Sequence, residues 1–362
     1  MLKTGVITKY YNNRNSGGLL QAYALIEALN GLGYDAEQIS YVQHKKIPIK
    51  NRLTAFAREC VIKAKTHGFF GLYKAPREFM LDIPHTQVYN YKTISKTNDI
   101  YDAFITGSDQ IWNPLLCTDG YFLEFADKDK TKISYAASIG IESLDDKQKE
   151  FFANSAKDFD AISLREKNLV ECLSEVLEKQ VEWMPDPTLL LSADDWEKAI
   201  RKVSDKRTEK PYILTYLLGG NQEHFRLANC LSEKAGVAVI NIPFTVNDYL
   251  KNKNNIYGIG PREFLWLIKN AEYVLTDSFH ATVFSILFNV KFGNTLREMN
   301  GNAKTTSRID SLYEMIDIPN HWIKDENDFD KISALNDTDN VEKRLQEIQN
   351  TGLEFLKKSL GE

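Results

Sequence analysis

Three polar residues, Asp277, Ser278 and His280, lie between an apolar segment at 273–276 and a helix-like segment at 281–288. The first amide groups of a helix have no partner within the helix, and the aligned peptide dipoles place partial positive charge there, so such a junction attracts phosphate or carboxylate. Imidazole ordinarily titrates close to neutral pH and can serve as an acid or as an anion ligand. The pattern predicts an anion-binding site, and a capped helix beside a packed histidine is the alternative.

A second polar segment contains Ser108, Asp109 and Gln110 and follows the strand-like segment 103–106. Gly107 precedes these residues, and its small size would let a sugar or a phosphate come close to the backbone. Asp109 could act as a general base toward a sugar hydroxyl or could hydrogen-bond it, and the ordinary acidity of a carboxylate favours the second role. A capped turn is the alternative interpretation.

Asn15 and Gly17 occupy a similar place, between a strand-like segment at 5–10 and a helix-like segment at 19–30. The spacing is not the G-x-G-x-x-G pattern of dinucleotide-binding proteins, so a dinucleotide is only weakly supported. We therefore predict that both residues belong to a substrate site of another kind.

Trp112 and Asn113 could form a platform on which a sugar stacks, and a buried structural tryptophan is the alternative. Arg165 follows another strand-like segment, 161–164. Its planar guanidinium could form two parallel hydrogen bonds to a carboxylate or phosphate of a ligand. A salt bridge from Arg165 to the neighbouring Glu166 or to another surface acid is the alternative.

Strand-like and helix-like segments alternate along the chain, which predicts an α/β fold with parallel sheets. The alternation pauses after residue 187 and resumes at 212–217, so we expect two Rossmann-like doubly wound domains that face a cleft. The expected N-terminal domain spans 1–195, the C-terminal domain spans 196–330, and a helix within 331–362 could pack back across both. Ligands of such sheets bind beyond the carboxyl ends of the strands, where the polar segments lie.

The composition is that of a globular enzyme, with 362 residues, 43% hydrophobic residues and a net charge of −5. Nucleic-acid-binding domains normally carry a basic excess, so no nucleic-acid partner is expected. The four cysteines contain no C-x-x-C pair and the six histidines no H-E-x-x-H spacing, so we expect neither disulfides nor a metal site. No signal peptide is recognised, and no apolar run approaches the roughly 20 residues of a spanning helix, so a cytoplasmic location is expected.

Residues 44–77 form a strongly basic stretch with interleaved aromatic residues. Its basic residues are Lys45, Lys46, Lys50, Arg52, Arg58, Lys63, Lys65, Lys74 and Arg77. Anionic membrane surfaces attract such segments by on the order of 1 kcal/mol per basic residue. The stretch therefore predicts peripheral docking at the inner face of the cell membrane, with RNA binding and a solvated helical hairpin as alternatives.

Six segments of the chain, in their order and spacing, resemble motifs of the polysaccharide pyruvyl transferase family. They are NSGGLLQAYAL at 15–25, TGSDQIWNP at 106–114, SYAASIG at 134–140, ISLRE at 162–166, DPTLL at 186–190 and DSFH at 277–280. The resemblance implies a GT-B-like fold and transfer of pyruvate from phosphoenolpyruvate, without a cofactor, onto a sugar of a capsular, exopolysaccharide or cell-wall precursor. The product would be a cyclic ketal, and phosphate would be released.

The resemblance also implies roles for single residues. It places Arg165 at the donor, and Arg308 is similar to a later family arginine that would form a second clamp. Lys304, in a loop at 300–304 that could close over the substrate, would neutralise charge, with a solvent-facing lysine as the alternative. His280 is the expected proton donor. The acceptor would be galactose or an N-acetylhexosamine linked to a polyprenyl diphosphate carrier, because the family's acceptors are often glycans on such a carrier.

Two other functions would use the same features. A GT-B sugar-nucleotide glycosyltransferase would hold a nucleotide diphosphate in the same cleft, because fold alone does not determine function. A non-catalytic glycan-binding subunit would keep the cleft and tolerate the loss of His280 and Arg165. Both residues are present, which favours an enzyme.

Overall fold

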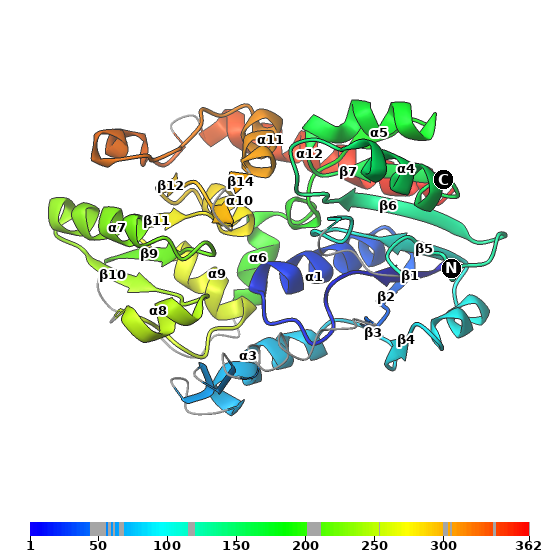
Figure 1. Cartoon of the computed structure of the whole chain (residues 1–362), viewed down its shortest axis with the longest axis horizontal. Helices are drawn as coiled ribbons and strands as arrows, with labels where there is room; N and C mark the ends of the chain where they lie inside the picture. The colour runs from blue at the N-terminus through cyan, green and yellow to red at the C-terminus, as the bar shows by residue number, and fades with distance from the viewer. Residues whose placement is uncertain are drawn as a thin grey trace.

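The structure is a computed structural model, built of two parallel sheets with helices packed around them (Figure 1). It describes residues 1–43, 56, 59–60, 62–64, 69–114, 120–200, 211–252, 254–299, 303–304, 306–335 and 338–361.

The first sheet, among the described residues, has six parallel strands in the order β2-β1-β5-β6-β7-β8. The strands are β1 (Lys3–Ile7), β2 (Asp35–Gln38), β5 (Ala103–Thr106), β6 (Thr131–Ala137), β7 (Ala161–Leu164) and β8 (Val181–Trp183). Every residue of β5 is buried, as expected for a central parallel strand that is covered on both faces. The short strands β3 (Tyr41–Val42) and β4 (Tyr89–Asn90) pair separately.

The second sheet has four described parallel strands in the order β10-β9-β11-β12. They are β9 (Tyr212–Tyr216), β10 (Ala238–Asn241), β11 (Tyr273–Thr276) and β12 (Phe292–Asn294). A hairpin follows, in which β13 (Glu298–Met299) pairs antiparallel with β14 (Ala303–Lys304). Lys304 therefore lies in a strand, and its side chain and residues 300–302 lie outside the described part of the chain. The predicted loop closure over a substrate stays a prediction.

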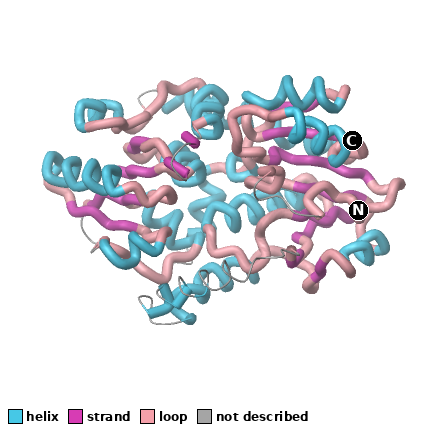
Figure 2. The backbone as a smooth tube through the Cα atoms, viewed as in Figure 1, coloured by secondary structure: helices cyan, strands magenta, loops and turns pink. Residues whose placement is uncertain are grey.

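Helices flank both sheets (Figure 2). The α-helices are α1 (Ser16–Gly31), α3 (Phe69–Leu81), α4 (Asp146–Ser155), α5 (Val170–Leu177), α6 (Ala193–Ile200), α7 (Gln222–Ala235), α8 (Val246–Lys251), α9 (Pro261–Lys269), α10 (Phe279–Leu287), α11 (Ser307–Ile316) and α12 (Thr338–Ser359). Short 3₁₀ helices are η1 (Ile94–Asp99), η2 (Lys167–Leu169), η3 (Pro187–Leu189) and η4 (Glu326–Lys331). Among the described helices, none combines the length and the apolar character needed to cross a bilayer.

Helix α1 occupies the middle of the molecule, where it contacts β2 of the first sheet and α9 beside the second sheet (Figure 1). The hydrophobic core is continuous between the two sides. The fully buried ring of Trp196 in α6 meets Phe284 of α10 edge-on with centroids 5.0 Å apart, and Tyr23 of α1 at 5.7 Å. Through Trp196, this apolar contact joins α1 to α10.

The last helix, α12, runs from the second sheet back to the first, so that both chain termini lie at the same end of the molecule (Figure 1). Arg344 donates from Nε to the carbonyl oxygen of Met315 in α11 at 2.9 Å, and Gln349 donates to the carbonyl oxygen of Leu190 at 2.6 Å. The helix thus contacts both halves of the chain.

Most of the basic stretch 44–77 lies outside the described residues. In its described part, Lys63 forms an ion pair with Glu59 at 3.1 Å, and Lys74 lies 4.0 Å from Glu78. The predicted membrane-docking surface stays a prediction.

Candidate functional site

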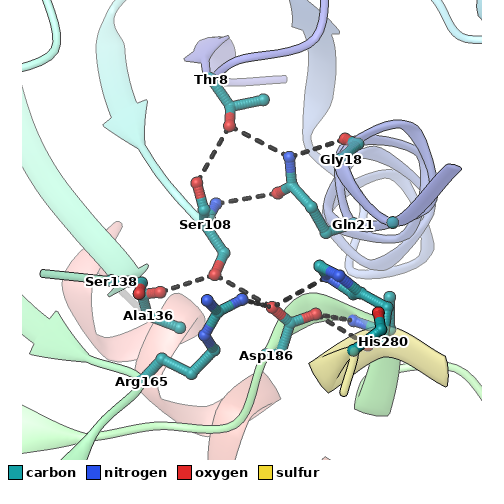
Figure 3. Close-up of polar contacts among 12 residues, drawn as sticks. Thr8, Gly18, Gln21, Ser108, Ala136, Ser138, Arg165, Asp186 and His280 are labelled. Atoms are coloured by element: carbon teal, nitrogen blue, oxygen red, sulfur yellow. Dashed lines mark hydrogen bonds and ion pairs between the residues drawn. The ribbon is translucent and has the colours of Figure 1, made fainter. Parts of the chain in front are cut away.

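The carboxylate of Asp186 is the centre of a buried polar network that joins the ends of β5, β7 and β8 (Figure 3). Its Oδ2 accepts a hydrogen bond from Nη1 of Arg165 at 2.7 Å and lies 3.1 Å from the hydroxyl of Ser108. Its Oδ1 accepts hydrogen bonds from the amide and the hydroxyl of Thr188 at 3.0 and 2.7 Å. Burial by itself raises the pKa of Asp186, but the attraction of His280 and Arg165 outweighs burial and holds this pKa well below its usual range.

Arg165 follows β7 directly, and only 2% of it is exposed. Its guanidinium lies over the ring of Phe279, with Cζ 4.3 Å from the centroid, in a cation–π contact. Desolvation lowers the pKa of Arg165, yet the charges of Asp186 and Glu166 more than compensate and raise it. Glu166 does not bond to Arg165, because its Oε1 accepts hydrogen bonds from the segment after β6. Arg165 and Glu166 therefore do not form the salt bridge that was the alternative for this pair.

His280 is the second residue of α10, and its imidazole reaches the N-terminal end of α1 (Figure 3). Its Nε2 lies 3.7 Å from Oδ2 of Asp186, an ion-pair distance that is longer than a hydrogen bond. The ring packs against Gly17, where a Cβ atom would overlap Nδ1. Gly17 therefore makes the room in which the imidazole sits, and contact between the two halves of the chain holds the ring.

Two further arginines come from the second half of the chain. Arg308, in the first turn of α11, is 8% exposed. Arg297 follows β12 and donates from Nη2 to the carbonyl oxygen of Asp277 at 2.6 Å. Burial, and after it the like charges of Arg297 and Arg165, lower the pKa of Arg308 to about 9. Because a guanidinium stays protonated at neutral pH, Arg308 keeps its charge there at a cost in stability.

Buried donors in this region have no hydrogen-bond partner among the described residues. They are Nε and Nη2 of Arg165, Nε of Arg297, Nε of Arg308 and Nε2 of His280. Unpaired buried donors are uncommon and costly in folded proteins. An anion would satisfy these donors and would also relieve the repulsion among the three arginines. We call Arg165, Arg297, Arg308 and His280 the cationic cluster.

Asp109 is a further acidic side chain near the cationic cluster. It is half-buried, with a left-handed φ of 64°. Its Oδ2 lies 3.5 Å from the position that a Cβ atom on Gly18 would take, and its charge acts on Arg165 and Arg308. Asp109 thus lies beside the first turn of α1, within electrostatic reach of Arg165 and Arg308.

Ser108 and Asn15 hold the backbone of the site in place. The amide of Ser108 donates to Oε1 of Gln21 at 2.9 Å, and Nε2 of Gln21 donates to the hydroxyl of Thr8 at 3.0 Å, which ties β5 to α1 (Figure 3). Asn15 caps α1 by accepting a hydrogen bond from the amide of Gly17 at 2.9 Å. Ser108 and Asn15 therefore position the backbone around the site.

The junction between β11 and α10 is also tightly bonded. Ser278 caps α10 by accepting a hydrogen bond from the amide of Ala281 at 3.4 Å. The two carboxylate oxygens of Asp277 accept hydrogen bonds from the amides of Leu218 and Gly219 at 2.7 and 2.8 Å. Asp277 therefore anchors the loop after β9. Ser278 caps α10, the helix that also carries His280.

Trp112 is fully buried, and its ring stacks on Phe122 with centroids 5.1 Å apart and planes 10° apart. The prediction that Trp112 forms a sugar-stacking platform is wrong, because neither face of the ring reaches solvent. Gln110 and Asn113 pack against Gly140, where a Cβ atom would collide with Gln110 and lie 3.2 Å from Nδ2 of Asn113. The segment after Asp109 thus turns into the core.

Comparison with known proteins assigns this arrangement to a family. The family model described as polysaccharide pyruvyl transferase matches residues 15–293. The chain belongs to this family. Among curated proteins, none matches the chain.

Solved structures align with nearly the whole of this pyruvyl transferase family member. UDP-GlcNAc 2-epimerase from Methanocaldococcus jannaschii, in complex with UDP-GlcNAc and UDP, is 16% identical with a TM-score of 0.54 and 98% of each chain covered. UDP-GlcNAc 2-epimerase from Neisseria meningitidis bound to UDP-GlcNAc is 11% identical, with a TM-score of 0.50 and 99% of each chain covered. MnaA of S. aureus with UDP is 15% identical, with a TM-score of 0.51 and 97% of each chain covered. At such identities the likeness shows the fold, and the predicted GT-B-like architecture is confirmed.

Two residues of the site, Asp186 and Arg297, were not predicted as functional from the sequence of this family member. Asp186 stands in the DPTLL motif. Its position as a polar residue at the carboxyl end of a strand could have indicated that it belongs to the site. Arg297 follows β12, a strand of three residues that is too short to show a pattern.

Proposed function

We propose that this protein transfers pyruvate from phosphoenolpyruvate to a sugar of a polysaccharide precursor, forming a cyclic ketal and releasing phosphate. The observation that carries the proposal is the cationic cluster, with its unpaired buried donors. Phosphoenolpyruvate has a carboxylate and a phosphate on the same carbon, and guanidinium groups match both by paired hydrogen bonds. Membership of the pyruvyl transferase family supports the same donor.

In the proposed complex, Arg165 and Arg308 hold the donor and Arg297 adds a third positive charge. Asp186 holds Arg165 through the 2.7 Å hydrogen bond and attracts the imidazole of His280 from 3.7 Å. Asp186 thus acts as a positioning residue for both groups.

The reaction starts when His280 transfers a proton to the methylene carbon of phosphoenolpyruvate, which becomes a methyl group and leaves positive charge on C2. A sugar hydroxyl adds to C2, and its proton passes through Asp109 back to His280. The bond between C2 and the phosphate oxygen then breaks, and the phosphate keeps the electron pair. A second hydroxyl of the sugar adds to C2 and closes the ketal, while its proton leaves with the phosphate.

For the acceptor, we propose galactose or an N-acetylhexosamine of a capsular, exopolysaccharide or cell-wall precursor on a polyprenyl diphosphate carrier. The basic stretch 44–77 would hold the enzyme at the inner face of the membrane, where such a carrier is found. Flotation with anionic and with neutral liposomes tests this part, and wild-type protein that stays behind with both would remove it.

The transfer itself is tested by phosphate release from phosphoenolpyruvate with aryl galactosides and N-acetylmannosaminides, with mass analysis of the acceptor. We expect acceptor-dependent phosphate release and the mass gain of one pyruvate ketal. UDP-sugars form the matched control arm. Turnover of a UDP-sugar without any turnover of phosphoenolpyruvate would replace the proposal with a glycosyltransferase, and sugar binding without turnover of either donor would indicate a binding subunit.

A further inference from the structure

A cavity of about 420 Å³ lies between the β1–α1 loop and the second sheet. Its volume falls in the range of small-molecule sites, roughly 300–1,000 Å³. Residues 12–16 form its wall on the first-sheet side. On the other side lie Tyr216, the last residue of β9, and three rings that follow β10, those of Phe244, Tyr249 and Tyr257.

The cavity ends next to the cationic cluster. Asn15 and Ser16 line it, and the following residue, Gly17, touches the imidazole of His280. On the opposite wall, Tyr216 lies within the electrostatic reach of Arg297. The cavity therefore adjoins the N-terminal end of α1, against which the imidazole of His280 also packs, and a ligand in the cavity would extend toward His280.

The lining of the cavity has the chemistry that binds a sugar ring. Tyr249 and Tyr257 stack with centroids 5.8 Å apart, and Phe244 meets Tyr216 edge-on at 6.3 Å. Phe244 is 45% exposed, so part of its ring is accessible to a ligand. Amide side chains, including that of Asn12, supply donors and acceptors that match hydroxyl groups.

The cavity is also close to neutral, in contrast to the cationic cluster. Its charged lining residue is Arg14, whose guanidinium lies over the ring of Tyr73 with Cζ 5.0 Å from the centroid. Arg14 is exposed, so water screens its charge, which acts on Tyr249 of the lining. An uncharged ring with several hydroxyl groups fits such a lining better than a second anion does.

We propose that this cavity binds the acceptor as a neutral hexose or N-acetylhexosamine ring, stacked on Phe244 and hydrogen-bonded by Asn12, with two hydroxyl groups directed toward His280. The inference rests on the proposed pyruvyl transfer, and it adds the site and the class of the second substrate.

The test uses two variants that keep the fold. Phe244→Ala removes an exposed ring, and Asn12→Gly removes the amide while glycine keeps the left-handed backbone, where φ is 55°. Leu250→Ala is the matched control, because Leu250 is 55% exposed in α8 and lies outside the lining of the cavity. The probes are 4-nitrophenyl β-galactoside and methyl N-acetyl-β-mannosaminide.

We expect the acceptor KM to rise about tenfold in Phe244→Ala and Asn12→Gly, as for truncated contacts at the centre of an interface, while the KM for phosphoenolpyruvate stays within about twofold. Saturation-transfer NMR without donor should show binding of at least one glycoside to wild type and to Leu250→Ala, and a weaker signal in the other two variants.

The outcomes separate this inference from the proposed reaction. Ketal formation by wild type with no difference among the three variants overturns the acceptor site and leaves the transfer intact. If wild type binds a glycoside, Phe244→Ala abolishes this binding and phosphoenolpyruvate is not turned over, the sugar site is supported and the transfer is overturned. The acceptor site is overturned if wild type binds neither glycoside. It is also overturned if UDP displaces bound glycoside from wild type and the Phe244→Ala and Asn12→Gly variants lose UDP binding.

Discussion

The cationic cluster and the aromatic cavity lie side by side at the start of α1, yet they are built from opposite kinds of side chain. The cluster consists of buried or half-buried arginines and a buried histidine, and several of their donor atoms have no partner among the described residues. The cavity is lined by aromatic rings and amides that need no counter-ion. Buried charges are costly and must be held by partners, whereas rings and amides are tolerant of change. We therefore expect changes in the cluster to alter the chemistry and the stability, and changes in the cavity to alter only the use of the acceptor.

The largest effect is expected from His280→Gln. Glutamine keeps hydrogen-bonding groups at this place but cannot donate a proton to carbon, so turnover should fall about a thousandfold, within the usual range for a general acid. The measurement is phosphate release at saturating phosphoenolpyruvate. Stabilisation of the variant by inorganic phosphate in a thermal melt serves as the control for an intact anion site, and near-normal turnover would remove the proton-donor role.

The next effect is expected from Asp186→Asn, which leaves the buried charge of Arg165 without its counter-ion. Breaking such a pair costs about 3–5 kcal/mol of stability. Turnover should fall at least about a hundredfold, because the imidazole loses the carboxylate that attracts it.

The pH dependence of unfolding tests the same residue. The folded pKa of Asp186 lies below the ordinary value of about 3.9, so its contribution to stability is fully present above about pH 4 and is lost as the pH falls further. The urea midpoint of Asp186→Asn should therefore fall less steeply below pH 4 than that of wild type. Equal slopes would contradict the assigned charge state.

Gly17→Ala probes the boundary between the two regions. The added Cβ would overlap the imidazole of His280, and a displacement of about 1 Å can cost up to about a hundredfold in rate. Gly31→Ala at the other end of α1 is the matched control, because a Cβ there meets nothing within 4 Å and should stabilise the helix by up to about 1 kcal/mol. Equal activity of the two variants would show that the position of the ring is unimportant.

The smallest effect is expected from Arg308→Gln, and it has two opposite parts. The KM for phosphoenolpyruvate should rise about tenfold, the loss expected when a charge-assisted hydrogen bond is removed. In the absence of ligand, the variant should melt about 1–3 °C higher, because burial and the neighbouring arginines disfavour the charge of Arg308. Added phosphate should reverse this order, since the anion stabilises wild type more strongly. A lower Tm without ligand would contradict the idea of a destabilising charge.

Much of the fold follows from local patterns. The apolar segments that were predicted as strands at 103–106, 161–164 and 273–276 are β5, β7 and β11, with the same bounds. The motif residues Asn15 and Ser278 cap helices, as their side chains favour. These features depend on residues a few positions apart, so a single sequence is enough to predict them.

Contacts between distant parts of the chain could not be predicted in this way. Trp112 looked like a surface platform because its motif follows a strand end, but the chain after Asp109 turns into the core and buries the ring. Arg297 joins the site because β12 lies next to β11 in the second sheet, a pairing that no local pattern shows.

The sequence by itself determined the alternation of strands and helices, the capped junctions, and the presence of Arg165 after a strand and of His280 at the start of a helix, since periodicity and capping act over single turns. Only the tertiary structure decided that Gly17 makes room for His280, that Asp186 joins Arg165 to the imidazole, and that an aromatic cavity lies beside them. The physical reason is that these contacts arise from the order of the strands and the packing of the two sheets around α1, which bring together side chains that are far apart in the chain.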